Sequence, residues 1–220
     1  MPSLLSFLKK NERYLYLEYG VFSLLIIWPL LAKDYVFAMD MPWPDKFNWP
    51  TEITNFLPFE IIFWLFNFII PSWAIQKILF FFIFFIAGLG AHKLVKTNHD
   101  WIKYFVALLY VLNPYMYDRF LYGQVYLCLA YALFPWLLMS LMSLYVKYSH
   151  QGFFEVLALT TLISFSALPY SFIAMLVILV FYFVAIAMAL LERDKNKTYV
   201  YLKVVIALIV GFLIINSFWI

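Results

Sequence analysis

The chain has little of what a soluble enzyme normally carries. Only 12% of its 220 residues are charged, whereas soluble domains average about 25%. It contains one cysteine, Cys128, which cannot form an internal disulfide, and its three histidines make no Cys/His pattern with metal-ligand spacing. No low-complexity segment, internal repeat or polar domain interrupts it. These absences exclude a disulfide-bonded scaffold, a zinc module and an ordinary soluble domain.

Apolar side chains are present in excess. The chain is 66% hydrophobic and 23% aromatic, more than a soluble core of this length can hide, so lipid must solvate most of it. A spanning helix needs about 20 mostly apolar residues. The sequence therefore predicts an all-α polytopic membrane protein, a single transmembrane module over residues 1–220 with about seven spans. The predicted spans are Tyr14–Ala32, Trp73–Leu94, Trp101–Tyr117, Gly123–Val146, Phe153–Leu168, Ser171–Leu191 and Tyr199–Ile220.

Two apolar runs near the N-terminus allow other interpretations. The first, 14–32, resembles a signal peptide in length, but Leu30 before Ala32 gives no small-x-small cleavage site. The second, Leu57–Ile70, reaches only about 21 Å against a hydrocarbon core of about 30 Å. We interpret the first run as a span and the second as an interfacial helix within a long first outer loop, residues 33–72.

The basic residues predict the orientation of the chain. With the N-terminus in the cytoplasm, most of the fifteen Lys and Arg residues face inward, as the positive-inside rule requires. The inward set is Lys9, Lys10, Arg13, Lys93, Lys96, Lys103, Lys147, Arg193, Lys195, Lys197 and Lys203. We therefore expect a multi-pass plasma-membrane protein whose first and second outer loops face the extracytoplasmic side. The final "GFLIINSFWI" has no polar tail, which favours the N-terminal part of a longer protein.

No predicted span carries an ionisable residue near its midpoint. Glu18, Lys77, Lys103 and Glu155 all lie within a turn or two of an end, where a long side chain can snorkel to the interface. Proton relays and ion pathways need charges at depth. The pattern argues against a proton-coupled transporter and leaves a lipid flippase open.

The first outer segment reads "KDYVFAMDMPWPDKFNWP". Its prolines fix φ between bulky aromatic residues, and a loop this long is usually functional or disordered. Asp40 precedes the rigid part and Asp34 follows the first span, so either carboxylate is a candidate general base or metal ligand. Trp43 and Trp49 equally fit an interfacial aromatic belt.

The second outer segment reads "NPYMYDRFLYGQ". Pro114 is expected to end the third span and Gly123 to open the fourth, presenting Asp118 and Arg119 between them. The arginine fork binds phosphate bidentately, and neighbouring tyrosines such as Tyr117 can line a sugar site or belong to the aromatic belt. Together the two segments suit a substrate with a lipid tail and a phosphate–sugar head.

Short motifs along the chain resemble the GT-C superfamily of membrane glycosyltransferases. They are "DYVFAMDMPWP", "GLGAHKL", "NPYMYDRFLYGQ" and "NSFW". More closely, they resemble a family of archaeal and bacterial membrane proteins called "6-pyruvoyl-tetrahydropterin synthase related", a name that implies no pterin chemistry here. The resemblance implies a seven-helix N-terminal module and a polyprenyl-phosphate sugar donor on the outer face. It also implies transfer of the sugar with inversion.

The resemblance also assigns roles to individual residues. Asp40 and Asp118 would be the catalytic carboxylates, with or without a divalent cation such as Mg²⁺ or Mn²⁺ held between them. Arg119 would hold the donor phosphate. Asp34 is the alternative for the first carboxylate. Apart from the resemblance, we expect Asp34, Trp43, Tyr117 and Gln124 to contact the substrate.

Two features depart from the GT-C pattern. The first loop has no adjacent acidic pair, and the chain supplies no C-terminal module for the acceptor, which a further module or a partner subunit would provide. The alternative function is a non-catalytic membrane protein that binds a lipid headgroup, either a flippase or a scaffold subunit. A purely structural subunit is a third possibility, and no nucleic-acid partner is expected.

Overall fold

The computed structural model describes residues 4–36, 39–41 and 43–219. In these ranges every regular element is a helix, which confirms the all-α prediction. Pro42, one of the prolines predicted to stiffen the first outer segment, lies outside the described residues. The chain divides into two compact units, residues 1–49 with 62–128, and residues 50–61 with 129–220. The prediction of one transmembrane module stays a prediction.

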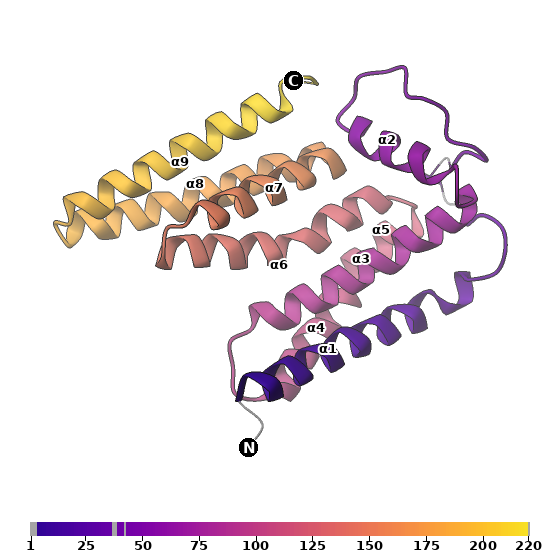
Figure 1. Cartoon of the computed structure of the whole chain (residues 1–220), viewed down its shortest axis with the longest axis horizontal. Helices are drawn as coiled ribbons and strands as arrows, with labels where there is room; N and C mark the ends of the chain where they lie inside the picture. Colours follow the sequence, from indigo (N-terminus) through magenta and orange to yellow (C-terminus); the bar gives the residue numbers. More distant parts are fainter. Residues whose placement is uncertain (1–3, 37–38, 42, 220) are drawn as a thin grey trace. The chain divides into compact units, whose positions relative to one another are not determined.

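The first unit is built around one long helix. Its elements are α1 (Leu4–Ile27), the 3₁₀ turn η1 (Trp28–Leu30), α3 (Ser72–Leu94), α4 (Asp100–Val111) and α5 (Pro114–Leu121). Both α1 and α4 pack along α3 (Figure 1). Ala87 and Ala91 of α3 and Ala107 of α4 are buried, and such small side chains let neighbouring helices approach closely.

The second unit has a group of three mutually packed helices. It contains α7 (His150–Ser166), α8 (Leu168–Leu191) and α9 (Lys195–Asn216), which pack against one another (Figure 1). Ala167 alone separates α7 from α8, with extended backbone, and Pro169 lies in the first turn of α8. Proline suits a first helical turn because its missing N–H is not needed there. Two further helices, α2 (Leu57–Phe66) and α6 (Val125–Val146), contain residues of both units.

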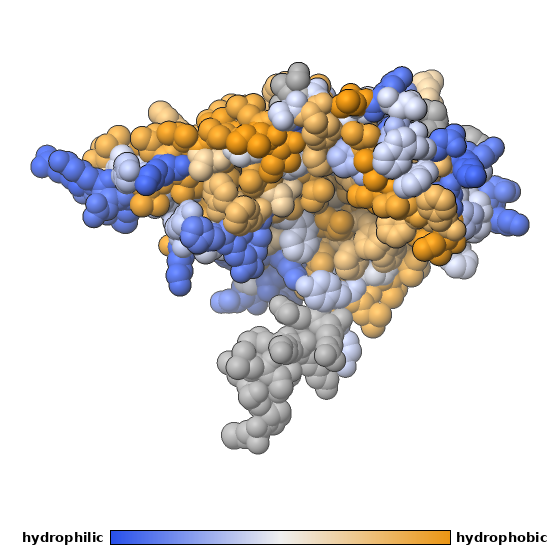
Figure 2. All heavy atoms as spheres, turned by 45° about the horizontal axis from the view of Figure 1, so that its top comes forward, coloured by the Kyte–Doolittle hydropathy of each residue, from blue (hydrophilic) through white to orange (hydrophobic). Residues whose placement is uncertain are grey.

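Four helices in the described chain are long and apolar enough to cross a membrane: α3, α6, α8 and α9. Shorter apolar helices cover Tyr14–Leu30 and α2. On the face drawn in Figure 2, hydrophobic residues cover broad continuous areas, and soluble proteins rarely expose such patches. A multi-span membrane protein is therefore supported, whereas the count of seven spans stays a prediction.

The third predicted span is not one helix. The structure ends α4 at Val111 and starts α5 at Pro114. Asn113 caps α5 because its side-chain oxygen accepts a hydrogen bond from the Met116 N–H at 2.9 Å, and Pro114 occupies the first helical position. The 12 residues of α4 reach only about 18 Å. Asp118 and Arg119 consequently lie on a short helix and not in a loop.

Candidate functional site

The C-terminal end of α5 turns the chain back on itself. Gly123 has φ of 82°, the left-handed region that glycine adopts without a steric penalty. Its N–H donates to the Phe120 carbonyl at 3.0 Å, and the Gln124 N–H donates to the Arg119 carbonyl at 2.9 Å. These two bonds form a Schellman motif. The motif places Gln124 beside Arg119, one turn back along the helix.

The Gln124 side chain joins the two outer segments. Its Oε1 accepts a hydrogen bond from Arg119 Nη1 at 2.8 Å, and its Nε2 donates to Asp40 Oδ2 at 2.6 Å. The backbone N–H of Asp40 also donates to the Tyr122 carbonyl at 2.8 Å. Asp118 Oδ2 lies 3.8 Å from Arg119 Nε. Four predicted site residues, Asp40, Asp118, Arg119 and Gln124, therefore form one connected group, here called the outer cluster.

Gln76 of α3 holds the segment that carries Asp40. It is 0% exposed, and its Oε1 accepts from the Val36 N–H at 2.9 Å. Its Nε2 donates to the Val36 carbonyl at 2.9 Å and contacts Met41 Sδ at 3.7 Å. The amide thus fixes the backbone before Asp40 and the side chain directly after it. Nothing in the apolar surroundings of Gln76 in the sequence pointed to this role.

Trp43 anchors the other side of the segment. It is 7% exposed, its ring packs against Phe47 and Phe63, and its indole N–H donates to the Ser72 carbonyl at 3.0 Å. Ser72 Oγ in turn donates to the Pro44 carbonyl at 2.5 Å. Through these contacts the indole holds the loop against the start of α3. The role of Trp43 as a substrate contact stays a prediction.

Two predicted substrate contacts stand apart from the outer cluster. Asp34 is exposed, with φ of 102°, a conformation rarely adopted by residues other than glycine. Tyr117 is exposed on α5. In the described ranges neither side chain hydrogen bonds to Asp40, Arg119 or Gln124.

The sequence interpretation missed a buried cation. Lys77 of α3 is 7% exposed, so it does not snorkel into solvent as expected. Within the described part of the chain it forms no hydrogen bond or ion pair, and Asp34 is the carboxylate that acts on it electrostatically. Three residues on, Phe80 packs edge-on against Phe120 of α5, which places Lys77 on the face of α3 directed at α5. The signal that could have identified it is a lysine inside an apolar run.

The outer cluster is not by itself a metal centre. Among the described residues no three His, Cys, Asp or Glu side chains gather to hold an ion. Asp40 Oδ2 accepts a hydrogen bond from Gln124, and Asp118 Oδ2 forms an ion pair with Arg119. Proteins usually hold magnesium with one or two carboxylates together with substrate phosphates and water, so Asp40 and Asp118 stay candidate ligands for an ion that arrives with a phosphate substrate.

Comparison of the chain with protein-family models, with curated proteins and with solved structures finds no match.

Proposed function

We propose that the protein is a GT-C-type membrane glycosyltransferase that uses a polyprenyl-phosphate sugar as donor. The observation that carries the proposal is the outer cluster, in which a carboxylate and a guanidinium are held by the two sides of one amide. A base and a phosphate-binding cation at a fixed separation are what glycosyl transfer from a phosphate donor needs.

The chemistry follows from the two charged groups. Asp40 accepts the proton of the acceptor hydroxyl as its oxygen attacks the anomeric carbon. The bond between that carbon and the phosphate oxygen breaks, and its electron pair leaves with the phosphate. Arg119 stabilises the departing phosphate, since a guanidinium has five donors and the contacts of Arg119 with Gln124 and Asp118 use only part of them. Its position over the Tyr115 ring, 5.5 Å from the centroid, limits its motion.

Lys77 supports a lipid-phosphate substrate. Burying an ammonium group away from any anion raises the free energy of the folded protein. That free-energy cost falls when an anion binds beside the ammonium. Because Lys77 lies on the α3 face directed at α5, the donor phosphate is the anion we assign to it. A tail in the bilayer and a phosphate near both Lys77 and Arg119 fit one polyprenyl-phosphate molecule.

The same proposal includes the membrane arrangement. We propose seven spans, a cytoplasmic N-terminus, and a site on the extracytoplasmic face of the plasma membrane. The inward bias of Lys and Arg supports this orientation, and the four long apolar helices support the environment. Acceptor binding is assigned to a further C-terminal module or a partner subunit.

The test is sugar transfer from a labelled polyprenyl-phosphate sugar in membranes containing the full-length protein. Asp40→Asn is expected to abolish turnover and leave donor binding near wild type. Asp45→Asn is the matched control, because Asp45 lies in the same loop and its exposed carboxylate takes no part in the outer cluster. Donor binding without turnover in the wild type across several sugars would favour the headgroup-binding alternative.

A second variant tests the proposed base. Gln124→Glu keeps an acceptor for Arg119 but places a second carboxylate beside Asp40, which disfavours the ionised base. The acid limb of the pH–rate profile is expected to move to higher pH. An unmoved limb would show that Asp40 is not the group whose ionisation controls the rate.

A further inference from the structure

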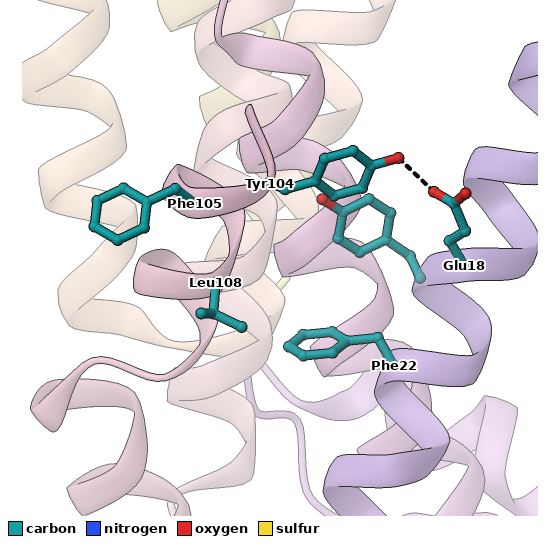
Figure 3. A pocket seen from close by; sticks show the side chains of 6 residues that line it. Glu18, Phe22, Tyr104, Phe105 and Leu108 are labelled. Carbon is teal, nitrogen blue, oxygen red and sulfur yellow. Dashed lines mark hydrogen bonds between the residues drawn. The ribbon is translucent and has the colours of Figure 1, made fainter. Parts of the chain in front are cut away.

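A second candidate site lies in the first unit, in a groove of about 590 Å³ between α1 and α4. Both helices pack on α3, and the side chains of the described residues that line the groove come from α1 and α4 (Figure 3). Ligand pockets are usually about 300–1,000 Å³. The lining residues are Glu18, Tyr19, Phe22, Tyr104, Phe105 and Leu108, and none belongs to the outer cluster.

One end of the groove is polar and carries a carboxylate. Tyr104 Oη donates to Glu18 Oε2 at 2.5 Å, the bond drawn dashed in Figure 3. Beside it, the Tyr19 ring stacks on the Tyr104 ring at 6.3 Å between centroids. Tyr19 Oη and His92 Nδ1 are hydrogen bonded at 3.0 Å, which fixes the Tyr19 ring. The second oxygen of Glu18 has no hydrogen-bond partner in the described residues. It points away from Tyr104 in Figure 3, and the Glu18 side chain is exposed.

The other end of the groove is apolar. One helical turn along α1 from Glu18 is Phe22, and one turn along α4 from Tyr104 is Leu108. Figure 3 shows both side chains directed into the space between the helices. Phe105 and Leu108 are exposed, so in a bilayer lipid reaches the groove from the side. The cavity thus passes from a carboxylate among aromatic rings to a hydrocarbon surface within about one turn, or about 5 Å.

The polarity of the groove identifies its ligand. The Glu18 carboxylate attracts a cation, and an ammonium group supplies both the positive charge and the hydrogen-bond donors that its second oxygen accepts. The apolar end matches an acyl chain. We propose that the groove binds a zwitterionic phospholipid, with the ammonium head at Glu18 and an acyl chain along Phe22 and Leu108.

The test is lipid retention by the purified full chain, measured by native mass spectrometry. The probes are phosphatidylethanolamine and phosphatidylglycerol of identical acyl chains, added in equal amounts. Wild type is expected to retain the ethanolamine lipid at least tenfold over the glycerol lipid. Glu18→Gln keeps an acceptor for Tyr104 but removes the charge, and it is expected to bring the ratio close to one. Glu52→Gln, an exposed carboxylate elsewhere, should leave the ratio unchanged.

Two further arms separate the parts of the proposal. Leu108→Trp fills the apolar end and is expected to reduce retention of both lipids, with thermal stability showing that the variant is folded. Water-soluble phosphoethanolamine at millimolar concentration should not displace the ethanolamine lipid, because it lacks the chain. Equal retention of both lipids by the wild type, or a Glu18→Gln ratio equal to wild type, would overturn the proposal. Displacement by phosphoethanolamine would replace the lipid with a soluble amine as ligand.

Discussion

Replacement of Gln76 by leucine should release the segment that carries Asp40. The change removes the acceptor of the Val36 N–H and the donor to the Val36 carbonyl, both at 2.9 Å. Each unsatisfied polar group costs about 1–3 kcal/mol when buried. Val36 is half-buried, so hydrogen bonds to water offset part of this cost. We therefore expect the free energy of loop opening to fall by about 2–4 kcal/mol.

The reporter is the backbone amide of Asp40, measured by hydrogen exchange. This amide donates to the Tyr122 carbonyl of the second outer segment, and Gln76 does not touch it, so its exchange reports docking of the whole segment. Since each 1.4 kcal/mol is tenfold, Gln76→Leu should accelerate its exchange by about 30- to 700-fold. Sugar transfer should fall in parallel.

A matched control exists on the surface of α7. Gln151 Nε2 donates to Glu155 Oε1 at 2.9 Å in an exposed pair four residues apart, worth about 0.2–0.5 kcal/mol. Gln151→Leu should leave the Asp40 amide unchanged. If Gln76→Leu also leaves it unchanged, the first outer segment is held without Gln76 and the account of its rigidity is refuted.

Two other substitutions test the packing of α3. At Gly88 an added Cβ would lie 2.9 Å from Tyr19 Cδ1, which is too close for a van der Waals contact. Gly88→Ala is therefore expected to lower the free energy of unfolding by about 1–3 kcal/mol. An added Cβ at Gly20 would meet nothing closer than 4.0 Å, so Gly20→Ala should raise the free energy of unfolding by about 0.5–1 kcal/mol. Denaturant unfolding in detergent measures both variants. Equal effects of the two would contradict the steric argument. Lys77→Met removes a buried charge that forms no hydrogen bond or ion pair among the described residues. We expect a higher unfolding temperature together with weaker binding of polyprenyl phosphate. A lower unfolding temperature would show that the Lys77 charge stabilises the fold.

Composition was sufficient to predict the class of fold. With so few charges, long apolar runs have no stable place except in helices within lipid, and α3, α6, α8 and α9 lie where such runs were expected. The boundary that failed was the one at Asn113. An Asn-Pro start and a Tyr-Gly end are the signals of a separate short helix, but they were interpreted as the end of one span and the start of the next.

The residues that form the outer cluster could be selected from the sequence, but those that support it from α3 could not. Asp40, Asp118 and Arg119 were conspicuous because charges are rare in this chain, and Gln124 followed from its place in the same motif. Gln76 and Lys77 were not assigned a role, because a single polar side chain in a long apolar run has the same appearance whether it points at lipid or at a loop. That direction is set by the rotation of α3 about its axis, which packing against α1, α4 and α5 determines.

The two glutamines of the site should therefore act as one unit. Gln76 holds the backbone before Asp40, and Gln124 donates a hydrogen bond to the Asp40 carboxylate. Once Gln76→Leu has released the segment, Gln124→Leu should therefore cause little further acceleration of exchange. A double-mutant cycle on Asp40 amide exchange should show a coupling energy of about 0.5–3 kcal/mol. The pair of Gln76→Leu with Gln151→Leu should add within about 0.3–0.5 kcal/mol, as distant sites do. Additivity in both pairs would mean that each glutamine holds its own segment independently, and that the two outer segments meet without forming a cooperative site.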